Sequence, residues 1–230
     1  MRDEAGRRAR AAYAGESVGV RVHVLGRWRS CPFAPIADAL AGAALVLDVG
    51  CGHGLLDLYL TARDPGQRVV GVDIDADKLA AGRAAVHRAG LDDRIEMVDV
   101  PAGWTPAVEP PARPPAGWPA IVIVDVLYLL GRDATTRLLA DAAAALAPGG
   151  RIVVKELDTE PAWKRRVSTA QEVVATRVLR ITKGSELDLV GSARLARTLG
   201  ELGLDVETVR LDRGRLHPHY LVIARRPEAH

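Results

Sequence analysis

Cysteine, aromatic residues and long apolar runs are all scarce in this chain of 230 residues. Cys31 and Cys51 are its two cysteines, too few for a disulfide framework or a cysteine-rich zinc site. No apolar run reaches the roughly 18 residues that a membrane span needs. Residues 1–12 are charged and lack the apolar core of a secretory signal. These absences predict a cytoplasmic protein without a membrane span.

An excess of charge of one sign is also missing, because 31 basic residues face 29 acidic ones and leave a net charge of +2. This balance produces no overall field for a polyanion, and no basic stripe of the nucleic-acid type is present. We therefore expect a small-molecule partner and no nucleic acid. The hydrophobic fraction of 48% is that of an ordinary core, and the length fits one domain with an extension.

From residue 44 onward, apolar strands alternate with helical segments, which is the rhythm of an α/β fold. Strands are expected at 44–49, 68–73, 94–98, 120–125 and 151–155, and helices at 55–62, 77–89 and 135–146. Asp75 or Asp77 is the N-cap candidate of the second helix, and Gly90 is its stop signal. The stretch 101–119 is rich in Pro and Gly and is expected to be a loop.

The two ends of the chain are expected to differ from this core. Helices are predicted at 161–180 and 192–202, followed by strands at 204–211 and 220–224. No helix fits between those two strands, so they should pair in antiparallel fashion. Residues 1–40, with helices expected at 7–14 and 36–41, form a helical extension before a domain of residues 41–230.

The most informative segment is residues 46–54, a buried strand that breaks into the turn Gly50-Cys51-Gly52-His53-Gly54 and then opens a helix. Glycines at such a turn let backbone N–H groups approach a ligand without interference from Cβ atoms. Carboxylates follow at the ends of later strands, namely Asp73, Asp99 and Asp125. Ligands of open α/β sheets bind outside the carboxyl ends of the strands. The pattern therefore predicts a nucleoside-containing cofactor, with Asp73 on its ribose hydroxyls.

Five motifs, in order along the chain, resemble those of class I S-adenosylmethionine-dependent methyltransferases. They are residues 48–54, 72–75, 98–100 and 123–128, and the Pro148-Gly149-Gly150 turn within residues 146–152. The resemblance covers roughly residues 42–225. It implies an α/β, Rossmann-like fold with a seven-stranded, mostly parallel sheet, helices on both faces and an antiparallel last strand. It also implies S-adenosylmethionine as the cofactor.

The same resemblance assigns cofactor contacts by position. On the methionine part of the cofactor it places Asp48 beside the amino group, and Gly50, Cys51 and Gly52 under the chain. On the nucleoside part it places Asp73 at the ribose, and Ile74, Asp99 and Val100 around the adenine. Asp125 and Val126 would lie near the sulfonium.

A dinucleotide cofactor is the competing interpretation of the glycine turn. That fingerprint requires Gly-x-Gly-x-x-Gly, whereas here the spacing is Gly50-x-Gly52-x-Gly54 with Leu55 following. The missing third glycine argues against close approach of a pyrophosphate.

The methyl acceptor is expected to bind where basic and aromatic side chains gather, in residues 1–40, after the fifth strand and in the last turn. Arginine pairs bind carboxylates and phosphates bidentately, so convergence of these residues would favour an anionic acceptor. The alternative, that they are solvated surface charges, stays open. The residues expected to bind the acceptor are Arg27, Arg29, Glu156 and His219.

Catalysis by such a protein rests mainly on placing a nucleophile in line, about 3 Å from the methyl carbon. An acceptor hydroxyl also needs a general base. Tyr128 and His23 are the catalytic candidates, and Glu156, His217 and His219 are further candidate bases. Asp125 and Asp158 offer two carboxylates without a third ligand, so no metal is expected.

The sequence therefore predicts an S-adenosylmethionine-dependent methyltransferase acting on a small molecule, with oxygen favoured as the methylated atom and an anionic acceptor as one of the open possibilities. Two alternatives stay open. One is a protein that binds the same cofactor but runs other chemistry, such as cyclisation or decarboxylation. The other is a non-catalytic binding subunit. The oligomeric state, a homodimer included, is also left open.

Overall fold

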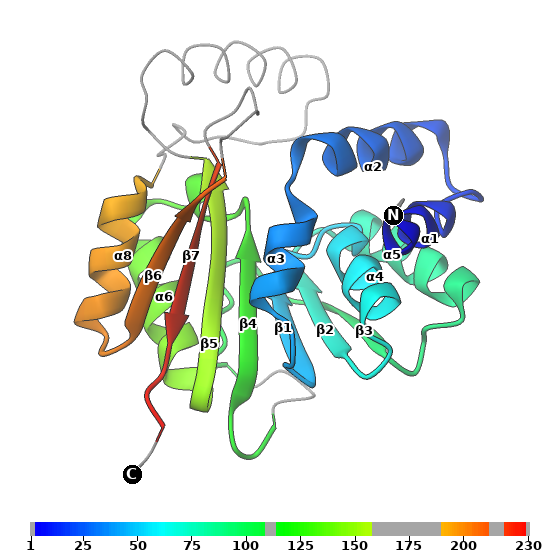
Figure 1. Ribbon diagram of the computed structural model, residues 1–230. Helices are drawn as coiled ribbons and strands as arrows, with labels where there is room; N and C mark the ends of the chain where they lie inside the picture. The colour runs from blue at the N-terminus through cyan, green and yellow to red at the C-terminus, as the bar shows by residue number, and fades with distance from the viewer. Residues whose placement is uncertain (1–2, 109–113, 158–189, 212–218, 229–230) are drawn as a thin grey trace.

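A single twisted sheet organises the computed structural model, which describes residues 3–108, 114–157, 190–211 and 219–228. The strand order is β3-β2-β1-β4-β5-β7-β6 (Figure 1). The strands are β1 (Leu45–Val49), β2 (Arg68–Asp73), β3 (Ile95–Asp99), β4 (Trp118–Val124), β5 (Leu146–Leu157), β6 (Asp205–Arg210) and β7 (His219–Arg225). β7 pairs antiparallel with β5 and β6, and the pairs among β1 to β5 are parallel. The α/β, Rossmann-like, seven-stranded fold expected from the sequence is confirmed.

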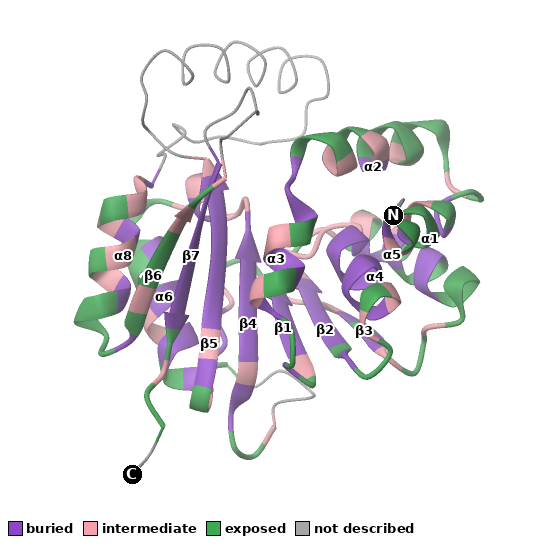
Figure 2. Ribbon diagram, viewed as in Figure 1, coloured by how far each residue is buried: buried purple, intermediate pink, exposed green. Residues whose placement is uncertain are grey.

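Helices cover both faces of this sheet. Strand side chains alternate between two buried clusters, so that Val46 belongs to one and Leu47 to the other. The first cluster packs under α1 (Glu4–Ala11), α2 (Val18–Ser30), α3 (Phe33–Ala39), α4 (Leu55–Arg63) and α5 (Ala76–Ala89). The second packs under α6 (Arg132–Ala145) and α8 (Ser192–Glu201). The central strands are therefore buried on both sides (Figure 2).

Local capping explains where α5 begins and ends. The side chain of Asp75 accepts a hydrogen bond of 3.1 Å from the backbone N–H of Lys78, which satisfies one of the unpaired donors of the first turn. Gly90 ends the helix in the left-handed conformation, with φ of +67°. Both are the signals that the sequence offers for this helix.

Helix α2 is the main departure from the expected elements, because residues 18–30 were not predicted as helical. The helix is capped by Ser17, whose hydroxyl accepts a hydrogen bond from the backbone N–H of Val20. Only Val24 is buried among its residues. It runs beside the carboxyl ends of the strands, linked by α3 to β1 (Figure 1).

Three strands are longer than predicted, namely β4, β5 and β7, which were expected at 120–125, 151–155 and 220–224. The helix expected at 161–180 lies outside the described residues. β4 begins at Trp118 and β5 at Leu146, because Trp118 pairs with Leu146 before the register shifts to Ala120 and Arg151. The Pro148-Gly149-Gly150 turn is thus a bulge inside β5, where a Cβ atom at Gly150 would lie 2.7 Å from the carbonyl oxygen of Trp118.

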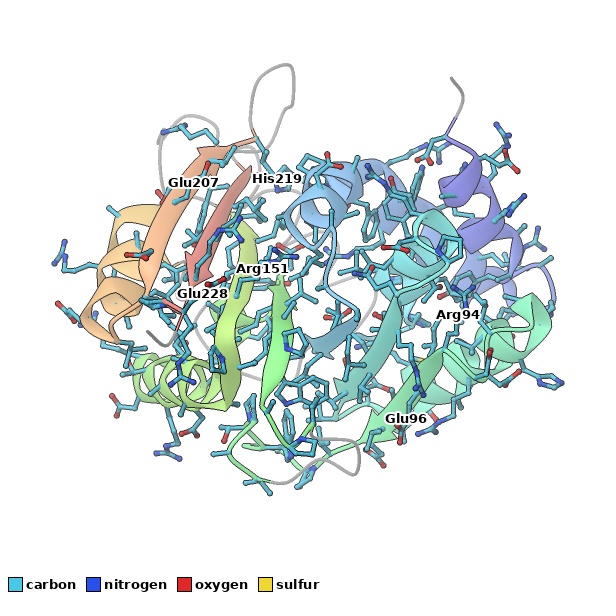
Figure 3. The ribbon with its side chains drawn as sticks, turned by 60° about the horizontal axis from the view of Figure 1, so that its bottom comes forward. Arg94, Glu96, Arg151, Glu207, His219 and Glu228 are labelled. Carbon is cyan, nitrogen blue, oxygen red and sulfur yellow. The ribbon has the colours of Figure 1, made fainter. Side chains whose placement is uncertain are left out.

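Two arginines near the amino ends of the strands form hydrogen bonds to backbone carbonyl groups. Arg94 donates hydrogen bonds to the carbonyls of Thr61 and Pro65, and Arg151 donates to the carbonyl of Ala41 (Figure 3). Arg94 thus links the turn before β3 to α4 and the loop after it, and Arg151 links β5 to the loop before β1. In the part of the chain that the structure describes, no helix is long and apolar enough to cross a membrane.

Candidate active site at the carboxyl ends of the strands

The glycine turn between β1 and α4 is held against the end of β2. The backbone N–H groups of Gly50 and Cys51 both donate to the carbonyl of Val72, at 2.8 and 3.1 Å. Gly50, Gly52 and Gly54 have φ values of +79°, +57° and +72°, which L side chains rarely adopt. The turn needs its glycines for this conformation.

The glycine turn is closely packed at Gly50 and open at Gly52. A Cβ atom at Gly50 would lie 2.4 Å from Cγ2 of Val126, so the turn touches the end of β4 there. A Cβ atom at Gly52 would meet only Cδ of Lys78, at 3.9 Å. The open side of Gly52 therefore leaves room for a ligand beside the backbone.

Asp73 lies at the end of β2 and faces this open side. Its Oδ2 accepts a hydrogen bond of 2.7 Å from Gly52 N–H, and its Oδ1 accepts one of 2.9 Å from Asp75 N–H. Each carboxylate oxygen has further acceptor capacity. The next side chain, Ile74, is 64% exposed although it is apolar. Asp99 is exposed at the end of the neighbouring β3, and Val100 N–H donates to the carbonyl of Asp73.

These residues fit the cofactor expected from the sequence. A carboxylate with spare lone pairs matches ribose hydroxyls, and the exposed Ile74 offers an apolar surface for a purine ring. The open side of Gly52 leaves space for an amino-acid moiety. The structure thus brings together Asp48, Gly50, Cys51, Gly52, Asp73, Ile74, Asp99 and Val100 around the ends of β1, β2 and β3.

Two acids lie buried beneath the turn. Asp48, in β1, is 2% exposed, and Asp57, in the first turn of α4, is completely buried. Burial raises the pKa of Asp48 to about 6, although a hydrogen bond with Asp57 works in the opposite direction. Burial also raises the pKa of Asp57 well above its usual value, and the charge of Asp48 raises it further. Sequence reasoning missed Asp57, whose only signal is an acid inside the apolar run 55–60.

The N-terminal extension contacts the glycine turn through a loop residue and through α2. The hydroxyl of Tyr13 donates a hydrogen bond of 2.5 Å to the carbonyl of His53. The ring of His23, from α2, lies 4.9 Å from the ring of His53 between centroids. Loss of hydration and the nearby charge of Arg27 lower the pKa of His23, and loss of hydration with the neighbouring His23 lowers that of His53 to about 4. Both rings are therefore neutral at pH 7.

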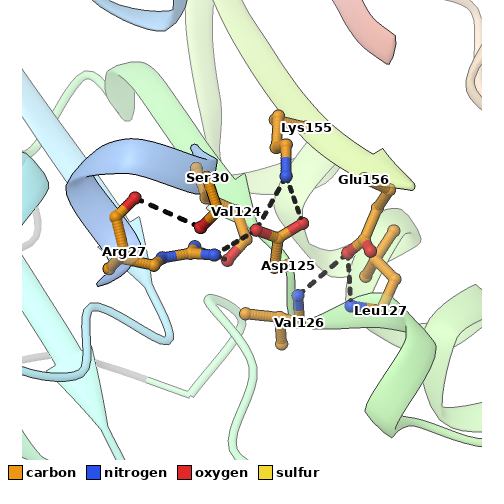
Figure 4. A network of polar contacts seen from close by, with 8 residues as sticks. All are labelled: Arg27, Ser30, Val124, Asp125, Val126, Leu127, Lys155 and Glu156. Atoms are coloured by element: carbon orange, nitrogen blue, oxygen red, sulfur yellow. Dashed lines mark hydrogen bonds and ion pairs between the residues drawn. The ribbon is translucent and has the colours of Figure 1, made fainter. Parts of the chain in front are cut away.

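Asp125, directly after β4, is the centre of a charged cluster (Figure 4). Nζ of Lys155 lies 2.6 Å from its Oδ1 and 2.8 Å from its Oδ2, and Arg27 of α2 forms an ion pair with Oδ2. Burial alone would raise the pKa of Asp125, but the charges of Lys155 and Arg27 hold it well below the usual range. Asp125 has φ of +56°, the one positive value among the described non-glycine residues. The carboxylate is thus fixed, ionised and doubly paired.

Glu156 lies beside this cluster at the end of β5 (Figure 4). Its Oε1 accepts hydrogen bonds of 2.9 and 2.7 Å from the backbone N–H groups of Val126 and Leu127. Its Oε2 is buried and has no hydrogen-bond partner among the described residues. Burial, together with the charge of Asp125, raises the pKa of Glu156 to about 8. The side chain is therefore mostly a neutral carboxylic acid at pH 7.

The other predicted site residues occupy different positions. Tyr128 is half-buried in the short 3-10 helix η1 (Leu127–Leu129), near enough to Arg27 to contribute to its raised pKa. Arg29 is exposed on α2. His219 is buried in β7, paired with Leu157. The structure therefore gathers Arg27, Asp125, Tyr128 and Glu156, and leaves Arg29 on the surface. His217 and Asp158 lie outside the described residues.

Residues 46–150 match the family described as methyltransferase domain. The chain is 33% identical over 141 residues to a trans-aconitate 2-methyltransferase of Rhizobium meliloti, covering 60% of this chain and 48% of that protein. It is 38% identical over 141 residues to a polyamine aminopropyltransferase of Mycobacterium tuberculosis, covering 56% of this chain and 26% of that one. The chain thus spans about half, or less, of the length of these curated relatives.

A solved structure shares the fold over nearly the whole chain. The magnesium protoporphyrin IX methyltransferase of Synechocystis, determined with bound SAH, superposes with a TM-score of 0.63 at 16% identity, covering 96% of this chain and 93% of that one. The sequence match over residues 46–150, the strand order and the glycine turn all agree with the resemblance to class I S-adenosylmethionine-dependent methyltransferases.

Proposed function

We propose that this protein transfers the methyl group of S-adenosylmethionine to an oxygen atom of a small, anionic molecule. The observation that carries the proposal is the charge balance of the cluster at the ends of β4 and β5. Two cations, Arg27 and Lys155, face one ionised carboxylate, Asp125. Glu156 adds little negative charge at pH 7, because its pKa is raised to about 8.

This surplus of positive charge favours an anion at the strand ends. The side chain of Lys155 is 1% exposed and that of Asp125 is 9% exposed, so water screens the cluster poorly. The side chain of Arg27 is 30% exposed and is the most accessible part of the cluster. We therefore assign Arg27 as the residue that an acceptor anion meets first.

The protonation states also favour an acceptor that arrives already ionised. Asp125 is a weak base because two cations stabilise its charge, and Glu156 holds a proton at pH 7. A carboxylate or phenolate nucleophile requires no proton removal before transfer, whereas a neutral hydroxyl does. His23 remains the base candidate for a protonated acceptor, and Tyr128 is proposed to orient the acceptor beside Arg27. Arg29 and His219 stand outside this assignment of the acceptor contacts.

The cofactor, when bound, supplies an electrophilic methyl group. The residues proposed to hold it at the ends of β1, β2 and β3 are Asp48, Gly50, Cys51, Gly52, Asp73, Ile74, Asp99 and Val100. Asp125 is proposed to contribute through the charged cluster that it forms with Arg27 and Lys155. Their task is placement, because an in-line arrangement of donor and nucleophile supplies most of the rate.

The N-terminal extension is proposed to complete the acceptor pocket. It brings Arg27 to the end of β4 and His23 to the glycine turn. The name of the Rhizobium meliloti relative supports an anionic acceptor, since trans-aconitate is a carboxylate. We propose a cytoplasmic site of action and a diffusible acceptor. Sedimentation of the purified chain distinguishes a monomer from a homodimer.

A second candidate function comes from the aminopropyltransferase relative, whose name records transfer of a group other than methyl. The charge of the acceptor separates the two functions. A polyamine acceptor is a cation, and the cluster around Asp125 carries a surplus of positive charge. We therefore rank methyl transfer to an anion above transfer to an amine.

Incubation with methyl-labelled S-adenosylmethionine tests the proposal. The panel pairs carboxylic acids and phenols with the corresponding amides and amines. Label transferred to an acid or phenol, with S-adenosylhomocysteine as by-product, supports it. Label on the amines alone, or tight cofactor binding without turnover on any acceptor, contradicts it and favours the other chemistry or a binding subunit.

A further inference from the structure

Asp57 is a buried acid that the proposed reaction leaves without a task. It lies in the first turn of α4, directly below the glycine turn, and is completely buried. Neither of its carboxyl oxygens has a hydrogen-bond donor among the described residues under the usual geometric criteria. An isolated ionised carboxylate in such a place is strongly destabilising.

The carboxyl group of Asp57 lies over Gly71, beside Asp48. A Cβ atom at Gly71 would lie 2.7 Å from Oδ2 of Asp57 and 2.8 Å from Sγ of Cys51. Gly71 is the register partner of Asp48 across the β1–β2 pair. Glycine is unfavourable inside a strand and often marks a close approach, and here it makes the space that Asp57 occupies.

Two adjacent buried carboxyl groups cannot both be ionised at low cost, and a hydrogen bond between them requires a proton. The pKa of Asp57 is raised well above its usual value, first by burial and then by the charge of Asp48. Burial raises the pKa of Asp48 to about 6, and the hydrogen bond with Asp57 works against that rise. Because Asp57 is completely buried and no donor among the described residues reaches its carboxyl oxygens, its protonated form is favoured.

We propose that Asp57 is a neutral carboxylic acid that donates a hydrogen bond to Asp48, keeping Asp48 ionised and oriented toward the ammonium group of the cofactor. Asp57 is thus a positioning residue for cofactor binding. This inference rests on the proposed function, which places Asp48 beside that ammonium group.

Other groups act on the pair from the elements packed around it. Asp73 at the end of β2 opposes ionisation of Asp48, and Arg27 of α2 favours it. Burial, and after it the nearby Asp57 and Asp48, raise the pKa of Cys51 in the turn. Burial and the nearby Asp57 raise the pKa of Tyr13 in the extension. His23 of α2 and His53 of the turn itself gain charge in acid. All of these groups stay in place when only Asp57 is replaced, so a comparison of Asp57 variants isolates its effect.

Calorimetric titration with S-adenosylhomocysteine between pH 5 and 8 tests the inference without any turnover. This ligand keeps the ammonium group. Wild-type affinity should fall by about tenfold from pH 7 to pH 5, because one pH unit below its pKa about one-tenth of a carboxyl stays ionised. The neutral donor in Asp57→Asn should keep the affinity at pH 7 within about twofold. Asp57→Leu should weaken it on the order of tenfold and move the midpoint of the profile to higher pH.

Three results of this titration would contradict the proposed role of Asp57. Equal weakening in both variants would show that the positive end of α4 holds Asp57 ionised, which overturns the inference. An unchanged midpoint in a folded Asp57→Leu protein overturns it as well. Wild-type protein that binds no S-adenosylhomocysteine would overturn the proposed function, and the inference with it, so the two failures are distinguishable.

Discussion

Arg27 in helix α2 forms an ion pair with Asp125 at the end of β4, 98 residues later in the chain. The same carboxylate also binds Lys155, so a helix of the extension and two central strands share one charged cluster. The strained φ of Asp125 directs its side chain into this cluster. The contact therefore links the extension to the place where we propose that the acceptor anion binds.

Arg27→Gln should raise the KM of an anionic acceptor by about tenfold or more, the scale of one charge-assisted hydrogen bond. Affinity for S-adenosylhomocysteine should change much less, because Arg27 acts on Asp48 only through its charge and Lys155 still pairs with Asp125. Steady-state kinetics and calorimetry measure the two quantities. Arg29→Gln, on the exposed side of the same helix, is the matched control and should change neither. Equal loss of both affinities in Arg27→Gln would indicate a folding role instead.

Lys155→Met should destabilise the fold by about 2–3 kcal/mol, less than a fully orphaned buried charge would cost, because Arg27 remains beside Asp125. The free energy of unfolding in urea measures this effect. Lys78→Met is the control, since Lys78 forms a partly exposed pair with Asp75 at 3.0 Å, and such pairs contribute less than about 1 kcal/mol. Similar losses in the two variants would contradict the buried cluster.

Asp73→Ala should weaken binding of S-adenosylhomocysteine by about 1.5–3 kcal/mol, because it removes a carboxylate proposed to accept ribose hydroxyls. It also removes the acceptor for Gly52 N–H, which loosens the turn. Asp77→Ala, exposed on α5, serves as the control. Calorimetry that finds the Asp73→Ala affinity unchanged would remove Asp73 from the cofactor site.

Glu156 should make the free energy of unfolding fall as the pH rises. Its pKa is raised to about 8 in the folded protein from 4.5, so the native state holds a proton that the unfolded chain releases. Its contribution is fully present below the unfolded pKa and is lost as pH rises through about 8. Glu156→Gln should lack this component, so its stability relative to wild type should improve between pH 6 and 9. Parallel stability profiles of the two proteins would show that Glu156 is ionised throughout.

The central strands and the cofactor motifs could be predicted from the sequence because their signals are local. The strand expected at 68–73, with its apolar centre between Arg68 and Asp73, matches β2 to the residue. The turn glycines come directly after β1, and Asp73 is the last residue of β2, so both could be located once the strands were predicted. Helix α2 gave the opposite signal, since valines at 18, 20, 22 and 24 alternate with the period of a strand and two glycines lie within it. Tertiary contacts of Val24, Arg27 and Trp28 hold it in place.

The charged cluster shows why acceptor residues are harder to predict than cofactor residues. Arg27 and Arg29 are indistinguishable in sequence, two positions apart on a basic stretch. Only the packing of α2 turns one toward Asp125 and leaves the other in solvent. The partnership of Asp48 and Asp57 likewise depends on the space that Gly71 leaves in the adjacent strand, which no motif encodes.

The most direct test of the account compares kcat/KM for a carboxylic acid acceptor and its primary amide, in wild-type protein and in Arg27→Gln, with methyl-labelled S-adenosylmethionine. We predict labelled ester from the acid, a wild-type preference for the acid of at least about tenfold, and loss of most of that preference in Arg27→Gln. Equal use of acid and amide by the wild-type protein, or the same preference in both proteins, would contradict the assignment of an anionic acceptor to the cluster around Asp125.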